Sequence, residues 1–154
     1  MIVSWNTTNA CNMYCDHCYR DAGCKAEDEL NTAEAKKLLD EIAKAGFKIM
    51  IFSGGEPLMR PDILELVAHA TSLGLRSVFG TNGTLITLEM AQKLKAAGAM
   101  GMGISLDSLD REKHNTFRKL PQAWQGAVAG MRNCRQAGLA LQIHTQGMEW
   151  NEHE

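Results

Sequence analysis

Residues 45–53 read AGFKIMIFS, a glycine followed by a short and almost continuous apolar run. A glycine just past a helical stretch is the usual left-handed helix cap. The apolar run after it is typical of a strand in a parallel sheet that helices cover. The same succession recurs at Leu73-Gly74-Leu75, Ala97-Gly98-Ala99 and Ala137-Gly138-Leu139. The chain therefore predicts a repeating helix-to-strand unit.

A helix is predicted before each of these glycines. The first opens at Asn31 and has Glu34 three residues later, which is the spacing of a capping box. The second and third begin near Pro61 and Thr87, and the fourth contains Trp124. Apolar residues recur at helical spacing along one face of each: Ala35, Leu38, Leu39 and Ile42 in the first, Ile63, Leu66, Val67 and Ala70 in the second, Ala91, Leu94 and Ala97 in the third, and Ala127, Val128 and Met131 in the fourth.

Five apolar segments alternate with these helices and are predicted to be strands, at residues 2–7, 49–53, 77–81, 100–105 and 139–145. About five strands alternating with four to five helices indicate an α/β fold with right-handed crossovers. Two architectures satisfy this order, a partial parallel (β/α) barrel and a doubly wound sheet. Because no linker or low-complexity segment interrupts the pattern, residues 1–154 are predicted to form a single domain.

Polar residues and glycines gather where each predicted strand ends. A single polar tip can simply mark the point where a strand meets solvent, but the opposite ends of these strands are apolar. In parallel β/α folds the carboxyl ends of the strands carry the active site. The tips, which therefore predict a site at this edge, are Asn6-Thr7, Ser53-Gly54-Gly55, Thr81-Asn82-Gly83, Ser105 with Asp107, and His144-Thr145.

Composition excludes several functional classes. The net charge is −2 and no basic stripe is present, which argues against nucleic-acid binding. No apolar run reaches the roughly 18 residues of a membrane span, and the N-terminus lacks the basic and apolar regions of a secretory signal. Five cysteines, an odd number, in a chain without an export signal favour a metal site in a reducing compartment over disulfides. Cytoplasmic localisation is expected.

Three of the cysteines lie in one short loop after the first strand, as Cys11-x3-Cys15-x2-Cys18. Thiolates are the usual ligands of iron–sulfur clusters, most of which take four. Three ligands would leave one iron open to an exogenous ligand, as in the open sites of catalytic zinc. Two alternatives stay open: a cluster closed by Cys24, and a zinc site completed by His17 or Cys24. Cys134, on an apolar helix face, is predicted to be buried.

This loop resembles the hallmark of the radical S-adenosylmethionine (SAM) superfamily. The resemblance implies a [4Fe–4S] cluster on Cys11, Cys15 and Cys18, with SAM bound to the fourth iron. It also implies a partial barrel of the radical SAM type. In that family, an electron from the cluster cleaves SAM to methionine and a 5′-deoxyadenosyl radical, and the protein positions the cofactors. A reductant such as flavodoxin or ferredoxin is the implied electron source.

A second motif of the family follows the second predicted strand, at Gly54-Gly55-Glu56-Pro57. Its resemblance to the GGEP segment implies contact with the SAM methionine. Two glycines would let the backbone approach the ligand closely, and the Glu56 carboxylate suits an ammonium partner. By the same resemblance Asn82, Ser105 and Asp107 are candidates to hydrogen-bond SAM. Without it, Asn82 reads as a plain turn residue and Asp107 as a helix cap.

The finer resemblance is to the branch that modifies sirohaem-derived tetrapyrroles in haem d1 and alternative haem synthesis. It rests on residues 4–23 and 51–60 and implies a tetrapyrrole substrate. Radical SAM enzymes that mature peptides share much of the same N-terminal sequence, and they remain one alternative. An inactive metal-binding fragment is another.

Relatives in this branch have six β/α units and a SPASM-type C-terminal extension that often binds further clusters. Only about five strands are predicted here, so the resemblance implies a radical SAM core domain that is truncated at its C-terminal end. Gln146-Gly147 is expected to interrupt the fifth strand, which would be an exposed parallel edge.

Overall fold

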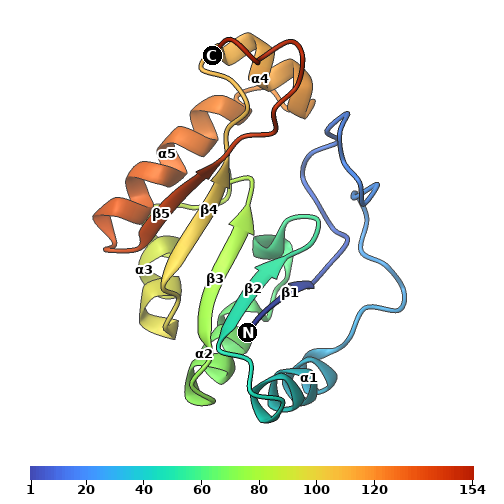
Figure 1. Cartoon of the computed structure of the whole chain (residues 1–154), viewed down its shortest axis with the longest axis vertical. Coiled ribbons are helices and arrows are strands. Elements are labelled where there is room, and N and C mark those ends of the chain that lie inside the picture. The colour runs from blue at the N-terminus through green and yellow to red at the C-terminus, as the bar shows by residue number, and fades with distance from the viewer.

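The structure is a computed structural model that describes residues 1–154, and its centre is a five-stranded parallel sheet (Figure 1). The strands lie in the order in which they occur along the chain, and each pairs in parallel with the next. They are β1 (Ile2–Asn6), β2 (Ile49–Ser53), β3 (Arg76–Thr81), β4 (Gly101–Ser105) and β5 (Ala140–His144).

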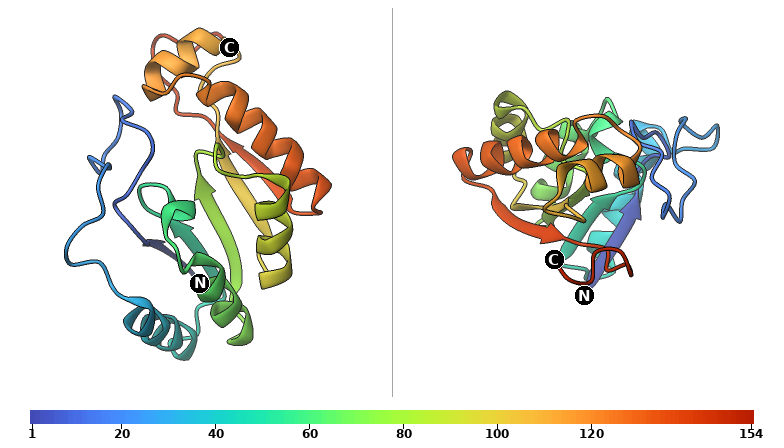
Figure 2. Two further views of the ribbon diagram at one scale, coloured as in Figure 1. Left: turned by 180° about the vertical axis from the view of Figure 1, so that it is seen from behind. Right: turned by 90° about the horizontal axis from the view of Figure 1, so that it is seen from above.

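This strand order decides between the two architectures that the sequence allows. A doubly wound sheet reverses direction at a switch point and carries helices on both faces, whereas successive strands of a (β/α) barrel stay in order with helices outside. Figure 2 shows the helices on one side of the sheet only. The prediction of an α/β partial barrel is confirmed.

Four helices cover the outer face, and a fifth lies beyond the carboxyl end of the sheet. The glycines that end the covering helices all have positive φ angles, between 74° and 102°, as the sequence predicts. The capping box at Asn31 and Glu34 is present. The helices are α1 (Thr32–Lys44), α2 (Ile63–Ser72), α3 (Leu88–Ala97), α4 (Arg111–Arg118) and α5 (Ala123–Gln136), with a short 3-10 turn, η1 (Pro57–Met59).

The core lies between the sheet and these helices. Phe52 and Phe79, from neighbouring strands, stack with their ring centroids 5.3 Å apart and are almost fully buried. Leu66 of α2 and Leu94 of α3 are fully buried in the same core. Each such side chain contributes about 1.5–3 kcal/mol when it leaves water. Cys134 is buried in this core too, as predicted.

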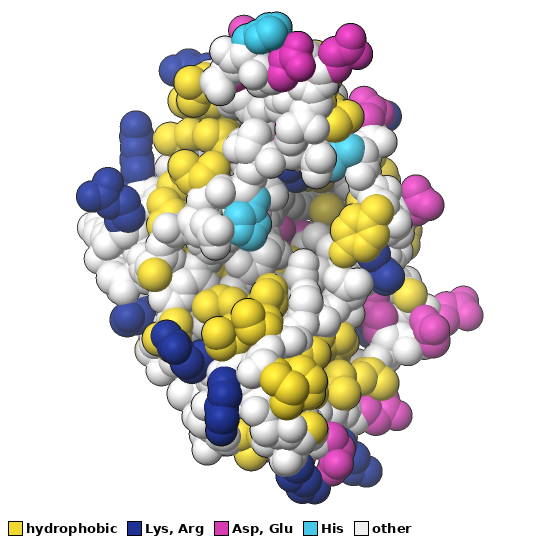
Figure 3. All heavy atoms as spheres, in the orientation of Figure 1, with side chains coloured by type: hydrophobic (Ala, Val, Ile, Leu, Met, Phe, Trp, Pro, Cys, Tyr) yellow, Lys and Arg dark blue, Asp and Glu magenta, His cyan; other side chains and the backbone are white.

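The opposite, open face of the sheet is only partly covered. Alternate strand residues point to it, and several of them are glycines, such as Gly80 and Gly103. Figure 3 shows this face, with apolar side chains gathered over its lower half and a histidine near its centre. A shallow hollow of about 300 Å³ there is lined mainly by apolar residues, among them Ile51 and Val78. The open face therefore leaves room in front of the sheet.

Beyond the strands, backbone pairing between the first two units continues into the loops. Gly55 N–H donates to the Thr8 carbonyl at 2.8 Å, and Glu56 N–H donates to the Ala10 carbonyl at 2.7 Å. These bonds hold the start of the cysteine loop against the tip of β2.

The Glu56 side chain fastens the tips of β2 and β3 to each other. It is fully buried and accepts hydrogen bonds from the Thr81 hydroxyl at 2.7 Å, from Asn82 N–H at 2.8 Å and from Leu58 N–H at 3.2 Å. Burial raises the pKa of Glu56, and these three hydrogen bonds oppose that rise. One carboxylate thus fixes two of the strand tips.

The chain after β5 folds back over the tip of β4. The Asn151 side chain donates to the Asp107 carbonyl at 2.7 Å, and the Glu154 carboxylate accepts from the Ser108 hydroxyl at 2.6 Å. β5 stops at His144, before Gln146-Gly147, as expected, and Ile143 on this edge strand is 52% exposed. None of the helices is both long and apolar enough to span a bilayer.

Replacing Glu56 with Gln is expected to lower the free energy of unfolding by about 1–3 kcal/mol, because the new amide N–H₂ would face a buried donor and leave it without an acceptor. Urea denaturation followed by circular dichroism measures this change. The matched control is Glu89→Gln at an exposed pair with Lys93, where the loss should stay below about 1 kcal/mol. Equal losses in the two variants would contradict the bracing role of Glu56.

Candidate functional site

A cavity of about 500 Å³ opens at the carboxyl ends of the strands. Its walls come from the tips of β2 to β5, from the cysteine loop and from the end of α4. Among the residues that the sequence predicts for the site, those that line this cavity are Cys15, Cys18, Gly54, Gly55, Asn82, Ser105 and Asp107. Cys11, Glu56 and Pro57 are not among the lining residues.

The cysteine loop has almost no regular structure and is held by a few backbone bonds. Cys11 N–H donates to the Gly23 carbonyl at 2.9 Å, and Gly23 N–H donates to the Asn9 carbonyl at 2.9 Å. The Met13 side chain is 2% exposed and anchors the middle of the loop. The ends of the loop are thereby brought together, and Cys11, Cys15 and Cys18 lie in the segment between them.

These three thiols are free and half-buried. Burial raises the pKa of Cys11, and negative charge on Glu56, Cys15 and Cys18 raises that pKa further while a backbone hydrogen bond lowers it. The thiols are therefore near enough to influence one another. Metal ligation by such thiols requires that they lose their protons.

The donor set can be judged by its chemistry. Thiolates are the usual ligands of iron–sulfur clusters, in which each thiolate binds a different iron. Cys24 is exposed, whereas the three loop thiols are half-buried. The three-thiol donor set therefore fits an iron–sulfur cluster with one open iron.

The two glycines of the Gly54-Gly55 segment pack closely against the cysteine loop. A Cβ atom at Gly54 would lie 2.4 Å from the Thr8 carbonyl oxygen, and one at Gly55 would lie 2.3 Å from that of Ala10. Gly54 also has a φ of 133°, which side chains rarely adopt. Glycine is therefore required here for the close approach to the cysteine loop, and both residues also line the cavity.

Glu56 and Pro57 lie behind the residues that line the cavity. The Glu56 carboxylate is fully buried and bonded to the tip of β3. Pro57 is buried as the first residue of η1. Both residues support the wall of the site from behind.

Asn82 and Asp107 line the cavity, but protein groups already occupy their side chains. Asn82 donates to Asn12 of the cysteine loop at 2.8 Å and accepts from the Thr84 hydroxyl at 2.7 Å. The Asp107 carboxylate pairs with Arg118 at 2.6 Å. Ser105, the third polar residue predicted to hydrogen-bond SAM, is half-buried and also lines the cavity.

The sequence reasoning missed Arg118 as part of the site. It lines the cavity from the last residue of α4. Burial raises the pKa of its partner Asp107, but the hydrogen bond and positive charge of Arg118 help to hold that pKa below its usual value. His114 precedes Arg118 by one helical turn and accepts a hydrogen bond from Asp107 N–H at 3.2 Å. This i, i+4 spacing after a strand-tip aspartate is the signal that was available.

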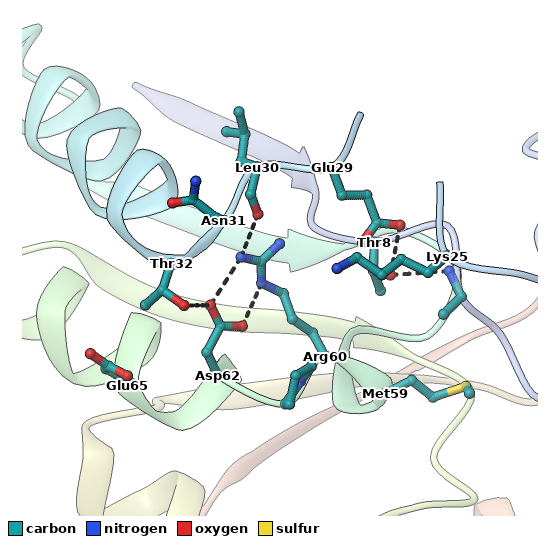
Figure 4. A pocket seen from close by; sticks show the side chains of 12 residues that line it. Thr8, Lys25, Glu29, Leu30, Asn31, Thr32, Met59, Arg60, Asp62 and Glu65 are labelled. Atoms are coloured by element: carbon teal, nitrogen blue, oxygen red, sulfur yellow. Dashed lines mark hydrogen bonds and ion pairs between the residues drawn. The ribbon is translucent and has the colours of Figure 1, made fainter. Parts of the chain in front are cut away.

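A second hollow, of about 440 Å³, lies on the other side of the cysteine loop (Figure 4). Its buried Arg60 bonds to Asp62 at 2.7 Å, to the Thr7 carbonyl at 2.8 Å and to the Leu30 carbonyl at 2.9 Å. Glu29 likewise accepts from Asn9 N–H at 2.7 Å. Because these groups satisfy one another, they brace both ends of the loop.

Comparison with known proteins places this site in context. The family model for the radical SAM superfamily matches residues 5–154. The chain is 46% identical over 141 residues to Fe-coproporphyrin III synthase of Methanosarcina barkeri, covering 91% of this chain and 35% of that relative. It is 42% identical to AdoMet-dependent heme synthase of Nitratidesulfovibrio vulgaris, covering 99% of this chain and 42% of that relative.

Solved structures share the fold at lower identity. The structure of anSMEcpe with bound AdoMet superposes with a TM-score of 0.73 at 18% identity, over 92% of this chain and 43% of that one. Methylornithine synthase gives a TM-score of 0.74 at 22% identity, over 94% of this chain and 44% of that one. The chain thus spans less than half the length of each of these proteins. With a family match that begins in β1 and runs through residue 154, the protein belongs to the radical SAM superfamily.

Proposed function

We propose that this chain is the cofactor-binding part of a radical SAM enzyme, with Cys11, Cys15 and Cys18 as ligands of a [4Fe–4S] cluster. When bound, the cluster and SAM would supply an electron and a 5′-deoxyadenosyl radical for hydrogen abstraction. The observation that carries the proposal is the convergence of one three-thiol loop and four strand tips on a single cavity. The family uses this pair of cofactors, and the donor chemistry of the thiols fits the cluster.

The chain's own residues would mainly position these cofactors. The Gly54-Gly55 backbone holds the loop at a fixed distance from the tip of β2. Asn82, through Asn12, ties the same loop to the tip of β3. Ser105, Gly80 and Thr145 provide small or hydroxyl-bearing groups along the remaining wall. The cavity is therefore polar, which suits the charged methionine end of SAM.

A tetrapyrrole is the substrate class that we propose. Two relatives, at 46% and 42% identity, are named for the synthesis of Fe-coproporphyrin III and of haem. The open face of the sheet, with its glycines and its apolar hollow next to the cavity, suits a flat apolar ring system. His144 lines both spaces and lies over Gly103, so the two are contiguous. A small electron-transfer protein of the flavodoxin or ferredoxin class would supply the electron.

Peptide maturation is the second candidate. The chain is 36% identical over 138 residues to mycofactocin maturase MftC of Mycobacterium tuberculosis. That identity is lower than the 46% and 42% identity to the relatives named for Fe-coproporphyrin III and haem synthesis. Substrate binding separates the two candidates directly.

Replacing Cys15 with Ala is expected to abolish cluster binding, because a cluster held by three thiolates cannot keep its site with two. Anaerobic reconstitution, followed by iron and sulfide analysis and by EPR of the reduced sample with and without SAM, measures this. Cys24→Ala is the matched control and should bind the cluster like the parent chain, with an EPR spectrum that changes on addition of SAM. A cluster that survives in Cys15→Ala and disappears in Cys24→Ala would contradict the ligand assignment.

Fe-coproporphyrin III is expected to bind the reconstituted chain with a saturable shift of its Soret absorption band, because the apolar hollow removes the ring from water. Introducing a charge there, as Val78→Glu, should weaken this binding at least tenfold, while Glu65→Gln on the outer face of α2 should leave it unchanged. Saturable binding of a mycofactocin-type precursor peptide, with no Soret shift, would instead favour peptide maturation.

A further inference from the structure

The end of α4 makes a contact with the cysteine loop that the proposed function does not yet use. Three consecutive residues, 117–119, touch three consecutive residues of the loop, 15–17, about one hundred positions earlier in the chain. Asp16 N–H donates to the Phe117 carbonyl at 3.3 Å, and the His17 ring stacks on the Phe117 ring with centroids 4.4 Å apart. Lys119 forms an ion pair with Asp16.

The third of these contacts involves a proposed cluster ligand. While it is protonated, the Cys15 thiol donates to the Arg118 carbonyl, with Sγ and O 3.8 Å apart. This bond is lost with the proton when the thiolate binds iron, but it shows that the Cys15 side chain lies against the end of α4. The last carbonyls of a helix have no donor within the helix, so they are available to the loop. Lys119 ends α4 in a left-handed conformation, with φ of 51°, and this leaves the carbonyls of Phe117 and Arg118 open toward Asp16 and Cys15. The contact between α4 and the cysteine loop therefore depends on the residue at which α4 ends.

The Arg118 side chain is held rigidly beside this contact. Its Nε lies 2.6 Å from Asp107 Oδ2, and the two side chains are 10% and 0% exposed. Asp107 is itself fixed by an accepted hydrogen bond from Gln146 N–H at 3.1 Å. A fixed positive charge and a proposed ligand thus share one wall of the cavity.

We propose that Arg118 is a positioning residue for the cluster: anchored by Asp107, it seats the Cys15 side of the loop and holds a positive charge beside that ligand. The inference rests on the proposed function, because it takes Cys15 to be a cluster ligand. Net charge and hydrogen bonds near the sulfurs set the reduction potential of iron–sulfur clusters. A fixed cation stabilises the reduced, more negative form and so raises the potential.

The test compares three variants of the full chain after anaerobic reconstitution. Arg118→Gln removes the charge, Arg118→Lys keeps it, and Arg111→Gln removes an equal charge from the exposed start of the same helix, where Arg111 lies over the Trp124 ring. Iron and sulfide content is measured first, and the midpoint potential is then obtained by an EPR-monitored redox titration. Circular dichroism establishes that each variant is folded.

Arg118→Gln is expected to bind the cluster with a more negative midpoint potential than the parent chain. Arg118→Lys should restore most of the difference, and Arg111→Gln should match the parent. Equal potentials in Arg118→Gln and Arg111→Gln would overturn the inference, as would an Arg118→Lys variant no closer to the parent than Arg118→Gln.

Removing Arg118 leaves Asp107 buried without its partner, which can unfold the chain. The double variant Asp107→Asn with Arg118→Gln removes both charges of the ion pair, and its potential should also lie below that of the parent chain, because the cation it loses is the charge beside Cys15. A double variant with the parent potential would overturn the inference. A parent chain that takes up no cluster, together with an equally empty Arg111→Gln, would instead overturn the proposed function, and the inference with it.

Discussion

Gly54 and Gly55 lie so near the backbone of residues 8–10 that a Cβ atom at either position would come within 2.4 Å of a carbonyl oxygen. This close packing lets the hydrogen-bond ladder of β1 and β2 continue into the cysteine loop. Because the loop has almost no regular structure of its own, its position is set mainly by contacts with other segments of the chain. Glu56, fully buried, then transmits the position of the β2 tip to β3, so the cavity walls depend on the same contact.

The sequence was sufficient for the five strands, for the four helices that cover the sheet and for their order, but it did not locate α4. The helix-capping glycines and the capping box at Asn31 are local signals, and they mark where the helices begin and end. The pattern of helices and strands did not decide between a partial barrel and a doubly wound sheet, because strand order depends on how the units pack against one another. The polar strand tips correctly predicted the edge at which the cavity opens.

Individual side-chain roles were harder to predict. Glu56 and Asp107 are the kinds of residue that bind ligands, yet the structure pairs them with Thr81 and Arg118. Such pairings join positions far apart in the chain, and no periodicity or spacing in a single sequence reports them. For Arg118, the i, i+4 spacing from His114 was a local signal, but its contacts with Asp107 and Cys15, which reach it from two other segments, left none.

The contact between residues 15–17 and 117–119 has a consequence for the order of assembly. Each strand pairs only with its neighbours in the sequence, so the sheet can grow unit by unit as the chain leaves the ribosome, N-terminal units first. The cysteine loop follows the first strand, but its dock on α4 follows the fourth. The thiols are therefore synthesised early and seated late, and loading of a cluster is expected only after the end of α4 has emerged.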